Sequence, residues 1–252
     1  MIGRLAAAFS ADVTGRFARA VACEVEFSFG GLSSASRPAV LDGANRLAVL
    51  SAGGTWEVLA FADAEEVALG HWRLTTLLRG LAGSEDAMAA GAVAGAPVVL
   101  LNTAVKPLGL SAEEAGRTLI FIAEPVSRPG RVGPFAFAGG LRAETPLSPV
   151  HLRAERRGGA IDITWVRRGR IDADDFEATD IPRDEDFERY RLEILDGDAV
   201  RRTVEVAAPG YSYASADEVL DFGGAQASLS IRVAQLGRKV PLGILARAEI
   251  AL

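Results

Sequence analysis

The feature that most constrains the fold is a series of short alternating segments in the second half of the chain. Each segment places an apolar residue at every second position, the pattern of a strand with one buried face. Turn-forming residues separate the segments, as in Arg156-Arg-Gly-Gly159. The expected strands are Val150–Glu155, Ala160–Arg167, Glu188–Leu195, Val200–Val206, Tyr211–Ala214, Ala227–Gln235 and Ala246–Ile250. Seven short strands at this spacing predict an immunoglobulin-like β-sandwich.

Trp165 is expected in the core of this sandwich. In a regular strand, Ile161 and Ile163 lie on its face, whereas Thr164 lies on the other. The stretch Gly169–Glu185 is acidic and irregular, which predicts a long loop between two strands.

The first half of the chain is also rich in strand patterns. Residues 1–20 are rich in alanine and weakly patterned, and we interpret them as an arm or a helix. Short helical turns are expected at Pro38–Asn45 and Ser84–Ala90, and Ser111-Ala-Glu-Glu114 fits a capping box that opens a short helix. The expected strands are Val21–Phe27, Leu47–Leu50, Thr55–Phe61, His71–Leu78, Pro97–Leu101 and Arg117–Ala123.

Composition changes between residues 125 and 149, where prolines and glycines gather. Such a stretch is typical of a loop or linker, so we place the domain boundary near Thr145. The sequence therefore predicts a mainly β protein. A β-rich domain with short helices covers residues 1–145, and a β-sandwich covers residues 146–252.

Composition and charge disfavour several classes of protein. The 252 residues include 27 basic and 33 acidic side chains, a formal net charge of -6, so binding to nucleic acid through a basic surface is not expected. No segment approaches the roughly 20 apolar residues of a membrane helix, and no signal-peptide pattern opens the chain. We expect synthesis in the cytoplasm and no membrane insertion. Cys23, the single cysteine, is interpreted as a small buried residue.

Catalytic motifs are missing from the sequence. It contains no nucleophile elbow, no phosphate-binding loop and no dinucleotide-binding fingerprint. Only two histidines, His71 and His151, are present, which makes a metal cluster or a histidine-based triad hard to build. We therefore expect no enzymatic activity and no cofactor.

Carboxylates in the acidic loop are the remaining candidates for a site. Asp172, Asp174 and Asp175 are weak candidates for a metal site, because their spacing is not that of an EF-hand. A pair of carboxylates from this cluster or from Asp184–Asp186 would suit glycoside hydrolysis. Few apolar neighbours are present to raise a carboxyl pKa, so a solvated acidic loop is the simplest interpretation.

Two further groups are candidates for contact with a partner. Arg167, Arg168 and Arg170 form a locally basic group beside the acidic loop. Three interpretations of these arginines are open: contact with the acidic loop, contact with a partner, or a solvated face of the sheet. Tyr211 and Tyr213 point the same way along their strand and form the most evident aromatic pair for stacking on a ligand.

Two stretches carry a family resemblance. The first contains Val40-Leu-Asp-Gly-Ala-Asn45, Trp56-Glu-Val-Leu-Ala-Phe61 and Trp72-Arg-Leu-Thr-Thr-Leu-Leu-Arg-Gly80, with Gly83 soon after. The second contains Pro146-Leu-Ser-Pro-Val-His151, Ile163-Thr-Trp-Val-Arg-Arg168, Tyr190-Arg-Leu-Glu-Ile-Leu195 and Val233-Ala-Gln235. In this order they resemble the C-terminal region of the large tail-tip, or baseplate hub, protein of gene transfer agents and related prophages of alphaproteobacteria. The second stretch is also similar to fibronectin type III domains.

The resemblance implies a structural part of a phage-like particle, at the distal end of its tail and close to the host surface. It implies three copies around the tail axis. The partners would be other tail or baseplate hub proteins and a host surface glycan or receptor. After synthesis in the cytoplasm, the protein would join the virion. Proteins of this family are usually far longer and carry a glycosidase-like barrel that this sequence does not contain, so the resemblance transfers no hydrolase activity.

Two other classes remain open. A carbohydrate-binding module requires exposed aromatic side chains on one sheet face, and an accessory glycosidase or peptidase requires carboxylates that converge in a pocket. The exposure of Trp56, Trp72, Tyr211 and Tyr213 separates these classes. We expect Trp56 and Trp72 in the core, and burial of all four side chains would exclude stacking on a sugar.

Overall fold

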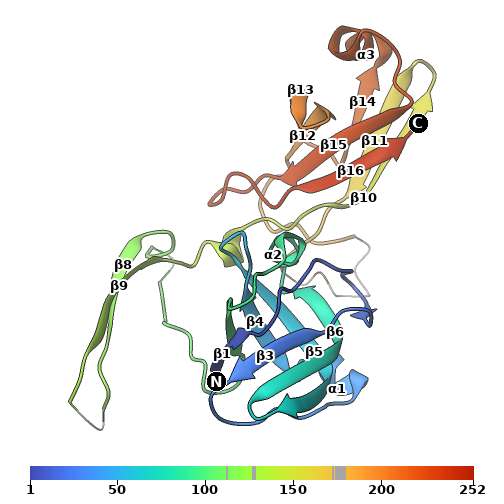
Figure 1. Ribbon diagram of the computed structural model, residues 1–252. Coiled ribbons are helices and arrows are strands. Elements are labelled where there is room, and N and C mark those ends of the chain that lie inside the picture. The colour runs from blue at the N-terminus through green and yellow to red at the C-terminus, as the bar shows by residue number, and fades with distance from the viewer. Residues whose placement is uncertain (112, 127–128, 172, 174–179) are drawn as a thin grey trace. The chain divides into compact units, whose positions relative to one another are not determined.

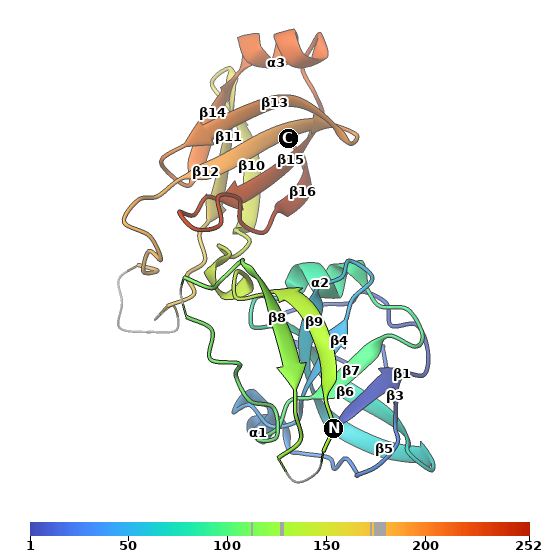
Figure 2. The ribbon, with the colours of Figure 1, turned by 90° about the vertical axis from the view of Figure 1, so that its left-hand side faces the viewer.

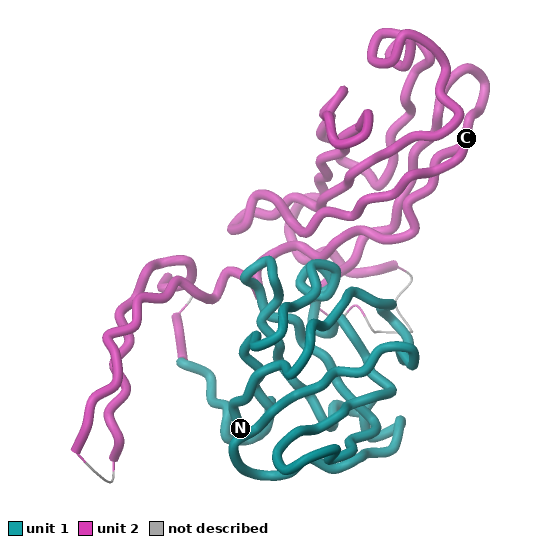
Figure 3. The backbone as a smooth tube through the Cα atoms, viewed as in Figure 1, with its two compact units in different colours: residues 1–108 teal, residues 109–252 magenta. Residues whose placement is uncertain are grey.

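The computed structural model describes residues 1–111, 113–126, 129–171, 173 and 180–252. The chain forms two compact units, Met1–Leu108 and Gly109–Leu252 (Figure 3). Strands dominate both units, which confirms the mainly β fold class. No helix among the described residues is long and apolar enough to cross a membrane.

The first unit is an antiparallel sheet that closes on itself (Figures 1 and 2). Its strands follow the order β2-β6-β3-β1-β7-β4-β5, and β5 also pairs with β6, which completes the barrel. Closure leaves these strands without long free edges. The strands are β1 (Ile2–Leu5), β2 (Phe17–Ala18), β3 (Cys23–Phe27), β4 (Arg46–Leu50), β5 (Trp56–Ala68), β6 (His71–Leu81) and β7 (Pro97–Leu100).

Alternation along the strands fills the barrel. In β3, Cys23, Val25 and Phe27 are buried, whereas Glu24 and Glu26 lie on the outer face. Burial raises the pKa of the Cys23 thiol to about 12, so this side chain acts as a small apolar residue, as expected. Two short helices complete the unit, α1 (Arg37–Leu41) and α2 (Glu85–Ala90), both near the expected positions.

The interpretation of residues 1–20 as an arm or a helix was wrong. The segment Ile2–Leu5 forms β1, which lies between β3 and β7 in the sheet. A Cβ atom on Gly3 would stand 2.2 Å from the carbonyl oxygen of Glu26, so the small residue permits this close pairing. Four residues are too few to show alternation. The extended conformation of this segment is fixed by its pairing with β3 and β7, which are distant in sequence.

The two tryptophans of this unit differ from one another. Trp72 is buried, as expected, whereas Trp56 is 42 % exposed, so its expected place in the core was wrong. The reason is the register of β5, in which Glu57 shares the inward face with Leu59 and Phe61. Trp56 opens the strand on the opposite face.

The second unit begins with a two-stranded hairpin. Among the described residues, its strands, β8 (Thr118–Ala123) and β9 (Val132–Ala138), pair only with each other. A short 3-10 helix, Arg142–Glu144, follows. Glu114 accepts hydrogen bonds from the backbone N–H and the hydroxyl of Ser111, as in a capping box. No helix follows in the described residues, because the chain turns at Gly116, which has a positive φ.

The rest of the second unit is a β-sandwich. One sheet has the order β10-β11-β14 and the other β13-β12-β15-β16, the arrangement of a fibronectin III or immunoglobulin-like fold. Every pairing is antiparallel. The strands and helix are β10 (Val150–Arg157), β11 (Ala160–Val166), β12 (Tyr190–Asp196), β13 (Ala199–Val206), β14 (Gly210–Ala214), α3 (Ser215–Phe222), β15 (Ser228–Gln235) and β16 (Ala246–Ala251).

Trp165 lies in the core of the sandwich, as its alternation predicts. It is 4 % exposed, and its ring meets the ring of Tyr190 edge-on at a centroid distance of 5.2 Å. Ile161 and Ile163 are fully buried in the same cluster. The tryptophan therefore joins the two sheets, because β11 and β12 belong to different ones.

The division between the compact units lies between Leu108 and Gly109, not near Thr145. The proline- and glycine-rich stretch is not a plain linker, since it contains β9 and the 3-10 helix. Ala143 in this helix accepts a hydrogen bond from Arg170, which ties the stretch to the sandwich.

Candidate interaction site

Arg167 fixes the end of the long loop that follows β11. Its Nε donates to the carbonyl oxygen of Ile181 at 2.8 Å, and its Nη2 donates to Asp180 at 2.6 Å. Its Nη1 donates to Glu188, which also accepts from the hydroxyl of Tyr190. Burial lowers the pKa of the Arg167 guanidinium, but the hydrogen bond to Asp180 and the charge of Glu188 outweigh it and raise that pKa above its ordinary value.

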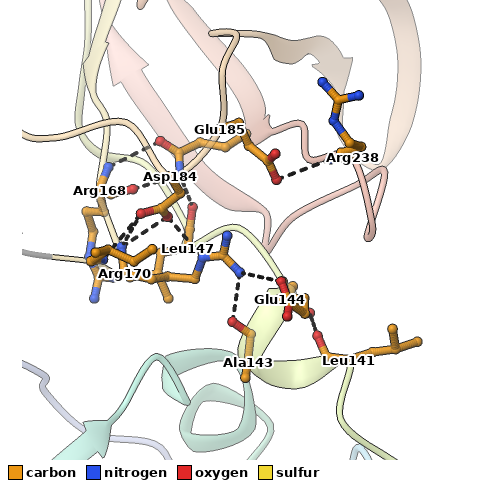
Figure 4. Close-up of polar contacts among 12 residues, drawn as sticks. Leu141, Ala143, Glu144, Leu147, Arg168, Arg170, Asp184, Glu185 and Arg238 are labelled. Atoms are coloured by element: carbon orange, nitrogen blue, oxygen red, sulfur yellow. Dashed lines mark hydrogen bonds and ion pairs between the residues drawn. The ribbon is translucent and has the colours of Figure 1, made fainter. Parts of the chain in front are cut away.

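Arg170 joins the same loop to the 3-10 helix (Figure 4). Its backbone N–H and its Nε both donate to Asp184, at 2.8 and 2.9 Å. Its Nη1 donates to the carbonyl oxygen of Ala143 at 2.7 Å and lies 3.9 Å from Glu144. The Arg170 side chain is only 15 % exposed, and its charge is compensated by Asp184 and Glu144 of the same chain.

Arg168 is held through its backbone. Its N–H donates to the side-chain oxygen of Gln235, whose Nε2 donates back to the Arg168 carbonyl at 2.9 Å. The same Nε2 donates to the carbonyl of Leu147, so one amide links three segments. Of the sequence-based alternatives for Arg167 and Arg170, contact with the acidic loop is therefore the one that the structure contains.

The expected metal candidates Asp172, Asp174 and Asp175 lie outside the described residues. Within the part of the chain that the structure describes, no three His, Cys, Asp or Glu side chains gather in a way that could hold a metal ion.

The second acidic cluster is neutralised by arginines. Asp184 is bound by Arg170, and Asp186 accepts two hydrogen bonds from Arg238, at 2.7 and 2.8 Å. The hydrogen bond from Arg238 holds the pKa of Asp186 below its ordinary value. A general acid needs a raised pKa, so the environment of Asp186 does not suit that role. The cavity beside the cluster measures about 40 Å³, too small for a sugar ring.

Tyr211 and Tyr213 share one face of β14, with ring centroids 6.5 Å apart, as the alternation predicts. That face is the core face, because the two residues pair with Ile163 and Ile161 across β11. Tyr213 is fully buried, and its hydroxyl donates to Asp221 at 2.7 Å. Tyr213 is therefore closed to stacking on a ligand, whereas Tyr211 is only partly buried.

Figure 1 shows strands β8 and β9 paired as a hairpin. This hairpin exposes several large apolar side chains. Cross-strand partners share a face, so Leu119 and Phe121 lie beside Phe137 and Phe135. The rings of Phe121 and Phe137 stand 6.4 Å apart, which agrees with this register. Phe135 and Phe137 are 54 % and 53 % exposed.

The opposite face of the hairpin is apolar as well. It carries Ile120, which is 63 % exposed and pairs with Ala136. Neither strand contains a charged residue. This surface was not predicted, because Gly133 and Pro134 mark β9 as a loop. The alternation of phenylalanine and alanine from Phe135 onward was the signal that could have found it.

Comparison with known families gives a match to the first unit. A family model described as "Rcc01698-like, C-terminal" matches residues 1–99. The match covers the barrel and ends before the hairpin. No curated protein matches the chain.

Solved structures give fold-level similarities. The extracellular domains d3-d4 of rat CD45 align at 10 % identity over 61 % of this chain and 74 % of that chain, with a TM-score of 0.31. Domains FN1-FN3 of chicken CNTN1 align at 11 % identity over 98 % of this chain and 65 % of that chain, also with a TM-score of 0.31. The Clostridium perfringens spore cortex lytic enzyme SleM aligns at 14 % identity over 43 % of this chain and 29 % of that chain, with a TM-score of 0.29. All three scores are low, so the description of the fold rests on the strand order itself.

Proposed function

We propose that this protein is a structural component of a phage-like tail tip or baseplate, which assembles at the distal end of the tail and presents a host-facing surface. The observation that carries the proposal is the β8–β9 hairpin, whose two strands expose apolar side chains and contain no charged residue. Side chains exposed in this way are typical of surfaces that another protein covers. An assembly protein needs such a surface, whereas a soluble single-chain enzyme does not.

Two further observations support the proposal. The resemblance of both stretches to the hub protein of gene transfer agents points to a tail. The family model that matches residues 1–99 carries a name associated with gene transfer agents. In this proposal the partners are other tail or baseplate hub proteins and a host surface glycan or receptor. The resemblance implies three copies around the tail axis.

A carbohydrate-binding module is the second candidate, and one observation favours it. Trp56 is 42 % exposed and could stack on a sugar ring. A single exposed ring is a weaker platform than a row of rings, and the tyrosine pair of β14 faces the core. Assembly through the hairpin therefore remains the better supported function.

The test is immuno-gold electron microscopy of particles released by the source bacterium, with antibody raised against the purified chain. We expect gold at the distal end of the tail. Antibody that has first been absorbed with the chain is the control. Particles without label, together with free protein in the cell, would contradict the proposal. A glycan array with wild type and Trp56→Ala would then test the second candidate.

A further inference from the structure

Two adjoining hollows lie on the sheet β10-β11-β14 of the sandwich. They measure about 460 Å³ and about 250 Å³, and both are lined by Arg153 of β10 and Thr164 of β11. The larger hollow extends past Asp162 to Ser212 of β14, and the smaller one extends to His151. Because they share two residues, the hollows form one elongated groove, which we call the sheet groove.

Strand register lines up the polar side chains of the sheet groove. Thr164 pairs with Arg153 on one side and with Gly210 on the other, and Asp162 pairs with Ser212. Thr164 and Asp162 alternate with the buried side chains of β11, so they lie on the face turned away from the core. A Cβ atom on Gly210 would stand 3.7 Å from the methyl group of Thr164, so the missing side chain deepens the groove at this point.

A β-bulge adds His151 to one end of the sheet groove. The register of β10 against β11 shifts between Val150 and Arg153, so β10 has one extra residue there. His151 has a positive φ of 54°, which is uncommon for a residue other than glycine. Bulges re-aim side chains and are frequent beside functional sites. The strand is thus irregular at the place where it borders the groove.

Arg153 supplies an unused positive charge to the sheet groove. It is exposed and forms no hydrogen bond or ion pair with another described residue. Its charged neighbours are already engaged, since Glu155 accepts from Arg157 at 2.6 Å and Asp162 accepts from the hydroxyl of Ser212 at 2.9 Å. That second bond uses one carboxylate oxygen, and the other oxygen of Asp162 still accepts.

These groups suit an acidic sugar chain. A guanidinium binds a carboxylate through two parallel hydrogen bonds. The carboxylate of Asp162 and the hydroxyl of Thr164 match sugar hydroxyls, which both donate and accept. Nucleic acid carries a charge on every phosphate, so Asp162, Glu155 and the net charge of -6 would repel it. The exposed side chains of the groove are mainly polar, which leaves an apolar peptide little surface to cover.

We propose that the sheet groove is a binding site for an acidic glycan. The carboxylate of a uronic acid unit binds Arg153, and the hydroxyls of the chain bind Asp162 and Thr164. The inference rests on the proposed function for its biological meaning, since it names the class of host surface glycan. The groove is open to solvent, so binding at one site is expected to be weak, with a Kd on the order of 1 mM.

NMR titration of the full chain with hexamers of galacturonate and of mannuronate tests the site. Wild type is expected to bind at least one of them, with the largest shifts at the amides of Arg153 and Thr164. The methyl ester of the same hexamer keeps the rings and most hydroxyls but lacks the charges, and it should bind about tenfold more weakly. Absence of binding to both hexamers would overturn the inference. Equal binding of hexaglutamate would assign the groove to an acidic peptide and overturn it as well.

Two substitutions separate recognition of a sugar from ionic attraction alone. Arg153→Gln is expected to weaken binding about tenfold. Asp162→Ala should also weaken binding, although it removes a negative charge, because sugar hydroxyls lose an acceptor. Arg201→Gln, which removes an exposed guanidinium from the other sheet, is the matched control and should bind as wild type does.

Unchanged thermal transitions of the barrel and the sandwich establish that these variants are folded. Binding that survives Arg153→Gln would overturn the inference, and so would stronger binding by Asp162→Ala. A hexamer that binds Arg153→Gln but not Trp56→Ala would place the glycan on the barrel and overturn the sheet groove as its site.

The outcomes also separate this inference from the proposed function. Gold at the tail tip, together with no binding of either hexamer, would overturn the glycan site and leave the tail function in place. Binding that depends on Arg153, without label on particles, would do the reverse.

Discussion

Arg79 and Glu57 form an ion pair that is entirely enclosed by the first unit. Their side chains are 0 % and 2 % exposed, and the guanidinium donates to both carboxylate oxygens, at 2.5 and 2.7 Å. The remaining nitrogen of the guanidinium, Nη1 of Arg79, donates to the carbonyl oxygen of Ser10. The Cζ atom of Arg79 lies 3.6 Å from the ring centroid of Phe9. Every charge is thus compensated, which a buried pair requires.

Removal of one partner of this pair should destabilise the barrel strongly. Glu57→Gln keeps the size of the side chain but leaves the Arg79 guanidinium buried without its counter-charge. Breaking a buried pair in this way costs about 3–5 kcal/mol. Urea denaturation, followed by tryptophan fluorescence with Trp165→Phe in both proteins so that the barrel alone is observed, is the measurement.

The control for this change is an exposed pair of the same unit. Arg73 donates to Glu24 at 3.0 Å, and their side chains are 50 % and 27 % exposed. Glu24→Gln is expected to alter the free energy of unfolding by less than about 1 kcal/mol. Equal effects of the two substitutions would contradict the role of the buried pair.

Trp165→Ala should unfold the sandwich more readily and spare the barrel. The side chain is 4 % exposed, and truncation of a buried aromatic residue costs about 3–5 kcal/mol. Differential scanning calorimetry should show one transition shifted to lower temperature and the other in place. Trp56→Ala, at a half-exposed site, serves as the control, and a Trp165→Ala protein with both transitions unchanged would disprove this packing.

Acid should weaken the contact of α3 with the sandwich. Asp221 accepts hydrogen bonds from Arg202 and Tyr213, at 2.6 and 2.7 Å. The hydrogen bond from Arg202 holds the pKa of Asp221 below its ordinary value of 3.8. A carboxyl whose pKa is lower in the folded state stabilises the fold above its unfolded pKa, and this contribution disappears as pH falls through the folded pKa.

The melting temperature of Asp221→Asn is therefore expected to lie below that of wild type at neutral pH. The difference should shrink once pH falls below 3.8 and vanish when the wild-type carboxyl is protonated. Asp198→Asn, at an exposed carboxyl paired with Arg247, is the control and should show little difference at any pH. A difference in melting temperature that persists in strong acid would show that Asp221 acts through its shape rather than its charge.

The strands of the sandwich could be predicted from sequence because each has one buried face, and alternation records that burial. Trp165 was placed in this way. The first strand of the hairpin was predicted at Arg117–Ala123, where β8 lies, but its exposure was not, because alternation reports an apolar face without reporting whether anything covers it. Gly133 and Pro134 added the opposite signal, since these residues usually mark a loop.

Ionic contacts were harder to predict than strands. Arg79 and Glu57 stand 22 positions apart, and a charged residue within a strand pattern normally indicates an outer face. The β5–β6 hairpin brings the two residues together, but the burial of their shared face inside the barrel could not be predicted from the strand pattern. The same holds for Arg170, whose partners lie on a loop and on the 3-10 helix before the sandwich.

Arg170→Gln should loosen both segments without unfolding the sandwich. The backbone N–H groups of Arg170 and Ile171 donate to Asp184, and the side chain keeps that carboxylate in place. Hydrogen exchange is expected to accelerate at these two amides, because loss of the guanidinium frees Asp184 to turn toward water. Arg157→Gln, which removes an exposed pair with Glu155, should leave them unchanged. Protection that survives Arg170→Gln would mean that the backbone hydrogen bonds alone hold the loop, and that the arginine is available to a partner after all.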